Sequence, residues 1–280
     1  MSGLEYMPRQ AGGFRLLGQA AYLEEAFLRT CCTGPEVGPA GGERVGSSPA
    51  ARVYRFTFAG RAYYQKWFLP RGWLEFVRDA WYGVRAERAR RGHVLLERWG
   101  FATPAVVLVG WRGPDSFMVT PAVEGAVRLR EFLEGLAGPF EAGRCAPPIA
   151  LRRRAAAALG CIIGRLHACR IAAGDLGSGN LFIWDGADGQ VGCIFLDNER
   201  TLRYRRLPER ARLKNLVQMN KLSERLASRT DRWRFWRAYL AENPCLQARQ
   251  RQWVRRVRRG TEERAQRRRE RRRRQGQRDN

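Results

Sequence analysis

The alternation of apolar and polar residues predicts a β-rich first part of the chain. Residues 53–58 (VYRFTF) and 62–68 (AYYQKWF) alternate aromatic or β-branched side chains with polar ones. A short turn joins the two runs, which is typical of a β-hairpin. Residues 105–111 (AVVLVGW) and 116–121 (SFMVTP) predict two further strands. This part of the chain therefore favours a sheet.

Apolar residues at helical spacing dominate farther along the chain. Helices are predicted over residues 73–99, 127–136, 151–169, 209–228 and 231–242. A strand-loop-strand unit is predicted over residues 172–197. The character of the sequence changes near residues 120–125, so the pattern indicates an α+β protein with a small β-rich part and a larger helical part.

The first fifty residues give a weaker pattern. Residues 1–30 favour some helix around Ala20–Leu28. Residues 31–50 are rich in Gly, Pro and Ser, and they predict a long mobile loop. One additional strand ahead of residue 53 is an alternative for this region.

The composition is that of a folded protein. With 280 residues, of which 44% are hydrophobic, the chain is long enough to bury a sizeable core. No apolar run approaches the ~18 residues of a membrane helix, and the start lacks a secretory signal pattern, so we expect a cytoplasmic protein. Seven cysteines without a C-x-x-C pair, together with two histidines, argue against a disulfide framework and a zinc site.

Positive charge is concentrated at the C-terminus. The net charge is +25, and residues 249–280 hold 15 arginines against four acidic residues. Such a charge run cannot bury a core, so it predicts either disorder or a solvated helix. The excess charge suits nucleic acid, or an anionic membrane face or lipid substrate. Charge alone does not distinguish these partners.

Lysine is rare in this arginine-rich chain. Of 52 basic residues, only Lys66, Lys214 and Lys221 are lysines. An ammonium group is compact, whereas a guanidinium group is a planar fork. A lysine that persists against this bias is a candidate for a position where the fork does not fit.

The segment AAGDLGSGNLFIW (172–184) carries the strongest chemical signal. Asp175 and Asn180 precede an apolar strand, and a second strand leads to Asp197. Phosphoryl transfer from Mg-ATP needs a carboxylate that receives the proton of the acceptor hydroxyl. It also needs an amide oxygen and a second carboxylate that hold metal ions. On its own, the spacing from 175 to 180 is equally typical of an Asx-capped turn.

In this arrangement the chain resembles the protein-kinase-like fold, and specifically the bacterial lipopolysaccharide kinase (Kdo/WaaP) family. The resemblance covers about residues 50–243 and rests on YYQKWF, VRAERARRGHVLLERWGFATPAVV, SFMVTPAVEGAVRLREFL, LHACRIAAGDLGSGNLFI, FLDNER and WRFWRAYL. It implies two lobes, a small β-rich N-lobe and a larger helical C-lobe. The expected parts are an N-terminal segment with a Gly/Pro-rich loop (1–50), a nucleotide-binding N-lobe (51–122), a catalytic C-lobe (123–246) and a basic tail (247–280).

The resemblance also implies a role for each site residue. It implies that Lys66 binds the phosphates of ATP and pairs with Glu87. Asp175 would be the catalytic base, and Asn180 and Asp197 would be magnesium ligands.

Three of these assignments have alternatives. Lys66 could be an ordinary charge on an edge strand, and Asp197 could end a strand with a turn. Glu87 could instead pair with Arg90 or Arg91 at helical spacing. Separately, the chain departs from the protein-kinase pattern at three points. Ala173 stands where kinases carry a histidine two residues before the catalytic aspartate, and Asn198-Glu199 rather than Phe-Gly follow Asp197. No clean G-x-G-x-x-G precedes residues 53–58.

The leading interpretation is an ATP- and Mg-dependent kinase of a sugar hydroxyl in lipopolysaccharide (Kdo or heptose) or in a related glycolipid. Its partners would be ATP and an anionic glycolipid or sugar. The basic tail would add peripheral contact with the inner face of the inner membrane, in preference to nucleic acid. The alternatives are a kinase of another small molecule or of a protein, and a pseudokinase or nucleic-acid-binding scaffold. Deleting residues 249–280 should abolish RNA binding by a scaffold but leave ATP turnover by a kinase.

Overall fold

The computed structural model of this protein describes residues 5–70, 72, 78–79, 81–137, 149–186, 189–223 and 225–276. Its contacts divide the chain into two compact units. Residues 1–124 and 196–200 form one, which we term the sheet unit. Residues 125–195 and 201–280 form the other, which we term the helical unit.

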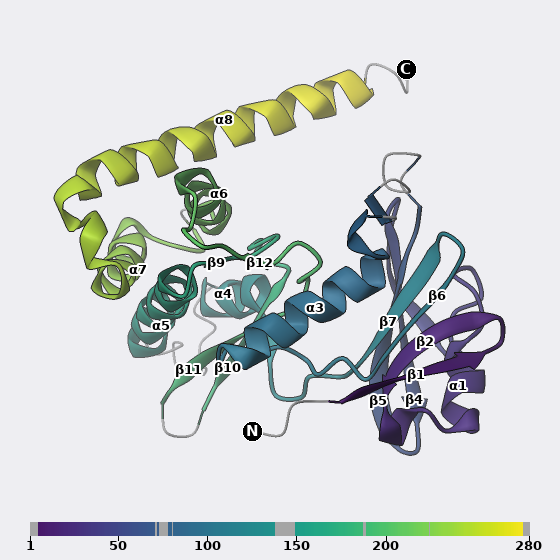
Figure 1. Ribbon diagram of the computed structural model, residues 1–280. Coiled ribbons are helices and arrows are strands. Elements are labelled where there is room, and N and C mark those ends of the chain that lie inside the picture. The colour runs from purple at the N-terminus through teal and green to yellow at the C-terminus, as the bar shows by residue number, and fades with distance from the viewer. Residues whose placement is uncertain are drawn as a thin grey trace, which may run out of the picture. The chain divides into compact units, whose positions relative to one another are not determined.

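A seven-stranded antiparallel sheet forms the centre of the sheet unit (Figure 1), with the strand order β1-β2-β6-β7-β5-β4-β3. Its strands are β1 (Tyr6–Ala11), β2 (Phe14–Gln19), β3 (Glu43–Ser48), β4 (Ala51–Phe58), β5 (Arg61–Phe68), β6 (Leu108–Arg112) and β7 (Asp115–Pro121). The predicted hairpin is confirmed as β4 and β5. Ala59 and Gly60 turn it with φ angles of 48° and 74°, as a two-residue turn of the primed type requires.

The first fifty residues contain three strands, of which the sequence pattern suggested one at most. The loop predicted over residues 31–50 is wrong where β3 pairs with β4 at the edge of the sheet. Strand β3 is largely exposed, so it lacks the apolar alternation that identifies a half-buried strand. The helix predicted around Ala20–Leu28 is confirmed by the 3-10 turn η1 (Ala20–Tyr22) and helix α1 (Glu25–Cys31).

Helix α3 (Arg85–Arg98) is shorter than the predicted helix over 73–99. Gly83, with a φ of 81°, interrupts the chain two residues before α3. Residues 73–77 and 80, in the first part of that prediction, lie outside the described residues. The predicted end is confirmed, because Gly100 follows α3 with a φ of 72°.

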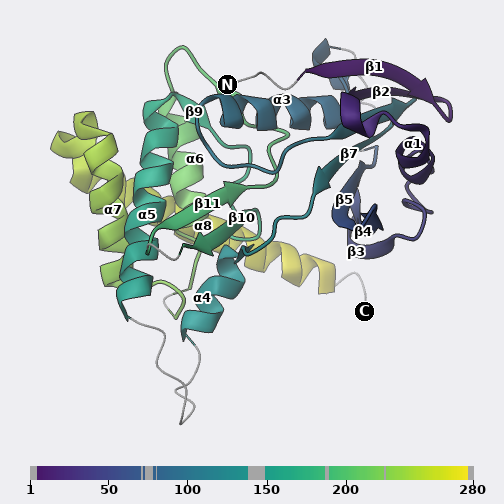
Figure 2. The ribbon, with the colours of Figure 1, turned by 90° about the horizontal axis from the view of Figure 1, so that it is seen from below.

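The helical unit contains five helices and five short strands among its described residues. The helices are α4 (Leu129–Ala137), α5 (Ile149–Ala168), α6 (Glu209–Met219), α7 (Arg229–Glu242) and α8 (Gln250–Gly276), and a 3-10 turn, η2 (Pro244–Arg249), precedes α8. The strands are β8 (Val127–Arg128), β9 (Ile171–Ala172), β10 (Leu181–Asp185), β11 (Val191–Phe195) and β12 (Leu202–Arg203). Helices α5 and α7 lie side by side (Figure 2). A Cβ at Gly160 of α5 would come within 2.2 Å of the Phe235 carbonyl oxygen, so this close packing requires glycine.

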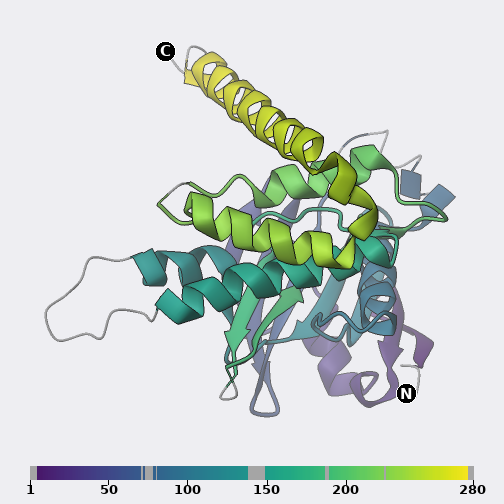
Figure 3. The same ribbon diagram turned by 90° about the vertical axis from the view of Figure 1, so that its left-hand side faces the viewer.

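For the arginine-rich C-terminal segment, the sequence predicted either disorder or a solvated helix. The segment forms one helix, α8, so the helical prediction is confirmed. The helix is not wholly solvated, because Trp253 is fully buried. Gly260 packs against Val217, where an added Cβ would lie 2.9 Å from a methyl carbon, and Asn220 Nδ2 donates to Thr261 Oγ1 at 2.9 Å. Past this contact the helix continues to Gly276 (Figures 1 and 3), and the side chains of residues 262–270 and 273–274 are exposed. No described helix is long and apolar enough to cross a membrane.

Candidate functional site

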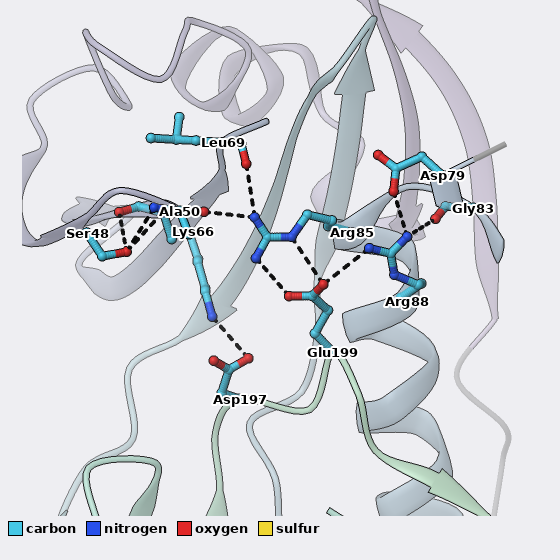
Figure 4. Close-up of polar contacts among 11 residues, drawn as sticks. Ser48, Ala50, Lys66, Leu69, Asp79, Gly83, Arg85, Arg88, Asp197 and Glu199 are labelled. Carbon is cyan, nitrogen blue, oxygen red and sulfur yellow. Dashed lines mark hydrogen bonds and ion pairs between the residues drawn. The ribbon is translucent and has the colours of Figure 1, made fainter. Parts of the chain in front are cut away.

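Lys66 projects from the inner strand β5 on the face opposite the aromatic core of the sheet unit. Its neighbours Gln65 and Trp67 are buried, and the alternation of strand side chains turns Lys66 to the other face. There its Nζ lies 3.1 Å from Asp197 Oδ1 (Figure 4). It also lies 5.0 Å from the centroid of the Phe68 ring. Both charged side chains are partly exposed, so a polar ligand can reach them.

Two buried ion pairs fix the segment that carries Asp197. Glu199 accepts hydrogen bonds from Arg85 Nη2 at 2.9 Å and from Arg88 Nη2 at 3.2 Å. Arg85 also donates to two backbone carbonyl groups beside β4 and β5 (Figure 4). Burial raises the pKa of Glu199, but the hydrogen bonds and charges of the two arginines outweigh it and lower this pKa to about 2. Glu199 is therefore an anion that holds the segment after β11 on α3.

Neutral contacts fix the same segment on the other side of the aspartate. His93 Nε2 lies 3.1 Å from the Leu196 carbonyl oxygen, and Asn198 Nδ2 donates to Thr103 Oγ1 at 3.1 Å. Burial lowers the pKa of His93 to about 4, so the ring is neutral. On the other side of the ring, Nδ1 lies 3.0 Å from the Pro104 carbonyl oxygen and 2.6 Å from Thr103 Oγ1, so both ring nitrogens face hydrogen-bonding groups. A Cβ at Gly92 would lie 2.0 Å from the Asn198 carbonyl oxygen.

Glu87 does not contact Lys66 in this structure. Its carboxylate binds Arg90 Nε at 2.7 Å and Arg91 Nε at 3.0 Å. These partners stand at i+3 and i+4 on the same helix, the spacing at which helical side chains meet. The Lys66–Glu87 pair implied by the family resemblance is therefore wrong here, and the alternative pairing along the helix is the one observed.

In the helical unit, Asp175 and Asn180 lie on one tight loop between β9 and β10. Asp175 Oδ1 accepts from the Gly177 amide at 3.1 Å, and the Asn180 amide donates to the Gly177 carbonyl at 2.8 Å. Asn180 Nδ2 lies 3.4 Å from the Asp175 carbonyl oxygen. The side chain of Asp175 is exposed. The loop therefore has the Asx-turn geometry and also presents a carboxylate and an amide side chain together.

Two amide side chains of α6 hold this loop. Asn215 Oδ1 accepts from the Ala173 amide at 3.0 Å, and Asn215 Nδ2 donates to the Ala173 carbonyl at 2.9 Å. Gln218 Nε2 donates to Asp175 Oδ1 at 2.6 Å. Asn215 thus satisfies both backbone groups of Ala173, the residue that stands where protein kinases carry a histidine. The sequence pattern does not predict the role of either amide, because a polar residue on a helix ordinarily faces solvent.

A buried histidine supports these amides from behind the loop. His167 of α5 lies with Nε2 3.2 Å from Asn215 Oδ1 and with Nδ1 2.8 Å from the Tyr239 hydroxyl. Burial, and next the charge of Arg212, lowers the pKa of His167 to about 3. The neutral ring donates to Asn215 and accepts from Tyr239, which Arg212 in turn contacts. The loop is therefore tied through neutral hydrogen bonds to three helices.

The three lysines all lie beside a candidate site residue. Lys66 binds Asp197, as described above. Lys214 Nζ donates to the carbonyl of Gly174, the residue before Asp175, at 2.6 Å. Lys221 follows the end of α6, three residues after Gln218, which binds Asp175. That these positions require a compact ammonium group stays a prediction.

The predicted residues thus fall into two pairs, each within one unit. Lys66 meets Asp197 in the sheet unit, and Asp175 meets Asn180 in the helical unit. Sequence reasoning missed the residues that position these pairs, which are Arg85, Arg88, His93, Glu199, Asn215 and Gln218.

Comparisons with known proteins place this arrangement in a family. A model of the lipopolysaccharide kinase (Kdo/WaaP) family matches residues 37–239, a range that includes both pairs. Among solved structures, the chain is similar to WaaP in complex with acyl carrier protein, with a TM-score of 0.59 and 22% identity. The match covers 79% of this chain and 88% of that chain, and it shows a shared fold. No curated protein matches the sequence.

Proposed function

This chain belongs to the lipopolysaccharide kinase (Kdo/WaaP) family, and we propose that it uses ATP and Mg²⁺ to phosphorylate a sugar hydroxyl of lipopolysaccharide or of a related glycolipid. Family membership makes it a kinase, a phosphotransferase with an alcohol group as acceptor. The observation that carries the proposal is the 3.1 Å ion pair between Lys66 and Asp197. It unites an ammonium group suited to phosphate with a carboxylate suited to a metal ion.

We interpret the two units as the lobes of a protein-kinase-like fold. The N-lobe would comprise residues 51–122 and the C-lobe residues 123–246. In this interpretation, Lys66 binds the phosphates of ATP and offsets charge that develops during transfer. Glu87 is bound to two arginines of its own helix, so we assign it no contact with ATP.

Asp175 is the proposed catalytic base. Its carboxylate is exposed and would accept the proton of the acceptor hydroxyl. Gln218 and the turn at Gly177 hold one carboxylate oxygen, so the other oxygen remains available to the hydroxyl. A carboxylate fixed in this way contributes through orientation as well as through basicity.

Asp197 and Asn180 are the proposed ligands of Mg²⁺. Carboxylate and amide oxygens are the hard donors that this ion prefers, and it is usually held by one or two carboxylates together with phosphate oxygens and water. Among the described residues, no group of three or more His, Cys, Asp or Glu side chains could hold a metal ion. When bound, Mg²⁺ would neutralise charge on the transferring phosphoryl group.

The acceptor class rests on the family and on charge. Lipopolysaccharide is an anionic glycolipid, and this chain carries a net charge of +25. Attraction between basic segments and an anionic leaflet is worth about 1 kcal/mol per residue near the surface. We therefore place the reaction at the inner face of the inner membrane, with peripheral contact through the basic tail.

A phosphate-transfer assay with radiolabelled ATP, purified protein and a lipopolysaccharide extract tests the proposal. We expect Mg-dependent labelling by the wild type and a loss of about 10²–10⁴-fold in Asp175→Ala, with ATP binding retained. Asp197→Ala should abolish the thermal shift that Mg-ATP induces. Asp185→Ala, at an exposed acid that ends β10, is the matched control and should change neither property.

Two outcomes would contradict the proposal at different points. Equal loss of ATP binding in Asp175→Ala and Asp197→Ala would contradict the division of roles between base and metal ligand. Retained ATP binding without labelling of the extract would contradict the acceptor class.

A further inference from the structure

The face of α8 that packs on the end of α6 continues as a cationic face. Gly260 and Thr261 contact residues at the end of α6. Arg264 lies one helical turn farther along, and Arg268 follows at i+4, so both fall on the same side of the helix. Both side chains are exposed. The packing face of α8 therefore becomes basic directly past its last contact with α6.

Lys221 lies between this face and the candidate catalytic loop. It follows the end of α6, three residues after Gln218, whose Nε2 donates to Asp175 Oδ1 at 2.6 Å. Partial burial lowers the pKa of Lys221, as do the charges of Arg264 and Arg268, whereas the charge of Asp175 raises it. Lys221 also borders a cavity of about 760 Å³ that Thr261 helps to line. We call Lys221, Arg264 and Arg268 the basic cluster.

The basic cluster has no acidic partner among the described residues. Three other arginines of α8 do have one, namely Arg256 with Glu209, Arg258 with Glu262 and Arg259 with Glu263. Within the part of the chain that the structure describes, no member of the cluster forms an ion pair. Three neighbouring cations repel one another, so an anion bound among them would be stabilised.

We propose that the basic cluster binds a phosphate group already present on the acceptor glycolipid and thereby places a sugar hydroxyl of the same molecule at Asp175. The proposal rests on the proposed role of Asp175 as catalytic base. Two guanidinium forks and one ammonium group match a phosphate of about −1.5 to −2 charge, whereas a single carboxylate would leave the cluster strongly cationic. Arg264 and Arg268 lie outside residues 37–239, so the family match does not account for them.

The acceptor would therefore be selected by an anchor separate from the reacting hydroxyl. Binding of a remote group orients the reacting hydroxyl, and this orientation raises the rate of the transfer step. The phosphate of ATP is not the expected occupant, because in the proposed function Lys66, in the sheet unit, binds it. Loss of the cluster should consequently affect the acceptor and leave ATP unaffected.

The test compares two double variants of the full-length protein. Arg264→Ala/Arg268→Ala removes two members of the cluster. Arg269→Ala/Arg273→Ala removes the same charge from an exposed i,i+4 pair on the other side of α8. Each variant is assayed with a detergent-dispersed lipopolysaccharide extract, and with the same extract after its phosphates have been removed with hydrofluoric acid.

With the phosphorylated extract, we expect the KM for acceptor to rise by about tenfold or more in the cluster variant, since a charge-assisted hydrogen bond contributes about 1.5–3 kcal/mol. The KM for ATP should stay within about twofold, and the control variant should resemble the wild type. With the dephosphorylated extract, the wild type should weaken to the level of the cluster variant. Lys221→Ala should act in the same direction.

Equal KM values for the two double variants on the phosphorylated extract would overturn the proposal. A difference that persists on the dephosphorylated extract would also overturn it, and would indicate general attraction to an anionic surface. Direct binding of both extracts, measured in an Asp175→Ala background, separates this proposal from the proposed function. Phosphate-dependent binding through the cluster without transfer by the wild type would contradict only the kinase assignment for this acceptor.

Discussion

The two halves of the candidate site are held by different kinds of interaction. In the sheet unit, the segment around Asp197 is fixed chiefly by charge, because Glu199 is buried against two arginines of α3. In the helical unit, the loop around Asp175 is fixed by the neutral amides of Asn215 and Gln218. One half depends on buried ion pairs, and the other depends on a satisfied network of neutral hydrogen bonds.

This difference matches the chemistry proposed for each half. The amide of Gln218 orients the Asp175 carboxylate, and among the described residues this carboxylate forms no ion pair, although the charge of Lys221 lies near it. Because an ion pair reduces the basicity of a carboxylate, an amide contact suits a group that must accept a proton, as proposed for Asp175. A carboxylate that holds a metal ion, as proposed for Asp197, has no such restriction. The segment around it can therefore be held by strong charges.

The largest effect should come from the closest backbone contact of the sheet unit. Gly92→Ala places a Cβ 2.0 Å from the Asn198 carbonyl oxygen, so the segment that carries Asp197 must move off α3. We expect a loss of phosphate transfer of about 10² or more and a fall in the free energy of unfolding of about 1–3 kcal/mol or more. Gly135→Ala, in the open part of α4, is the control and should be neutral or slightly stabilising. Normal activity in Gly92→Ala would show that this contact does not position the aspartate.

The charged half should be sensitive to loss of its buried anion. Glu199→Gln keeps the shape of the side chain but leaves Arg85 without a counter-charge and Arg88 with Asp79 alone. Breaking such a pair destabilises a protein by about 3–5 kcal/mol, which urea unfolding would measure. The exposed pair of Glu262 with Arg258 provides the control, and Glu262→Gln should cost about 1 kcal/mol or less. Similar values for the two variants would show that burial does not strengthen the dependence on Glu199.

Acid should weaken both halves, but through different groups. The pKa values of His93 and His167 in the folded protein, about 4 and about 3, lie below the ordinary value of 6.5. The stability due to their neutral forms is therefore complete above pH 6.5 and is lost as the pH falls from there toward 4 and 3. Loss of the Glu199 contribution occurs at lower pH, as the pH falls from 4.5 toward 2.

The contribution of His93 is on the order of 3 kcal/mol. The charge of Lys66 lowers the pKa of His93 and the charge of Asp197 raises it, so these two effects partly cancel. We expect His93→Gln to flatten the pH dependence of the free energy of unfolding between pH 6.5 and 4. An unchanged slope in this variant would show that His93 is not the titrating group.

The neutral half should respond to loss of Asn215. Asn215→Ala leaves the Ala173 amide and carbonyl without partners in a buried position, at a cost of about 1–3 kcal/mol for each unsatisfied group. We expect a loss of stability in thermal unfolding and a fall in kcat, since the loop that carries Asp175 becomes mobile. Unchanged kcat in a folded Asn215→Ala protein would show that the network is structural only.

The smallest effect should come from Gln218, which contacts the carboxylate of Asp175 directly. Gln218→Ala is expected to lower kcat about tenfold through loss of one hydrogen bond of about 1–1.5 kcal/mol. The KM for ATP should not change, because the side chain of Gln218 binds Asp175, Leu176 and Asn215, all within the helical unit. A rise in the KM for ATP with constant kcat would contradict this positioning role.

The fold could be predicted from the sequence wherever a strand or helix buries one face. Strands β4 and β5 alternate along most of their length, whereas β7 is a short, almost continuously buried run. Strand β3 escaped prediction because it is an exposed edge strand with polar side chains. The helix predicted over 73–99 is divided at Gly83, because residues 78–79 and 81–82 are helical before it and α3 follows it.

The local structure around the candidate site residues could be predicted, their chemical roles stay predictions, and their partners could not be foreseen. Asp175, Asn180 and Asp197 are adjacent to strands, so their spacing reveals them. The partner of Glu87 depends on which side of α3 faces the sheet, and sequence spacing does not fix that side. Asn215 is fully buried on α6. A buried amide resembles a surface residue in sequence, and only its position three residues before another amide, Gln218, offers a signal.

The basic tail was read as a charge run, and its anchor was overlooked. Trp253 is the one aromatic residue in residues 249–280, and it is fully buried. A deletion from residue 249 would therefore remove part of the core. A loss of activity in that variant would have two causes, unfolding and loss of a binding segment. A truncation after Thr261 keeps the contact with Asn220 and removes the exposed part of α8 alone.

The scarcity of lysine has a practical consequence for chemical labelling. Arginine does not react with amine-directed reagents, so only three side chains of this protein can be modified in this way. One of them contacts Asp197, one contacts the residue before Asp175, and one lies in the basic cluster. Protection of each lysine, followed by mass spectrometry, would therefore report separately on nucleotide, on the catalytic loop and on acceptor, without any engineered probe.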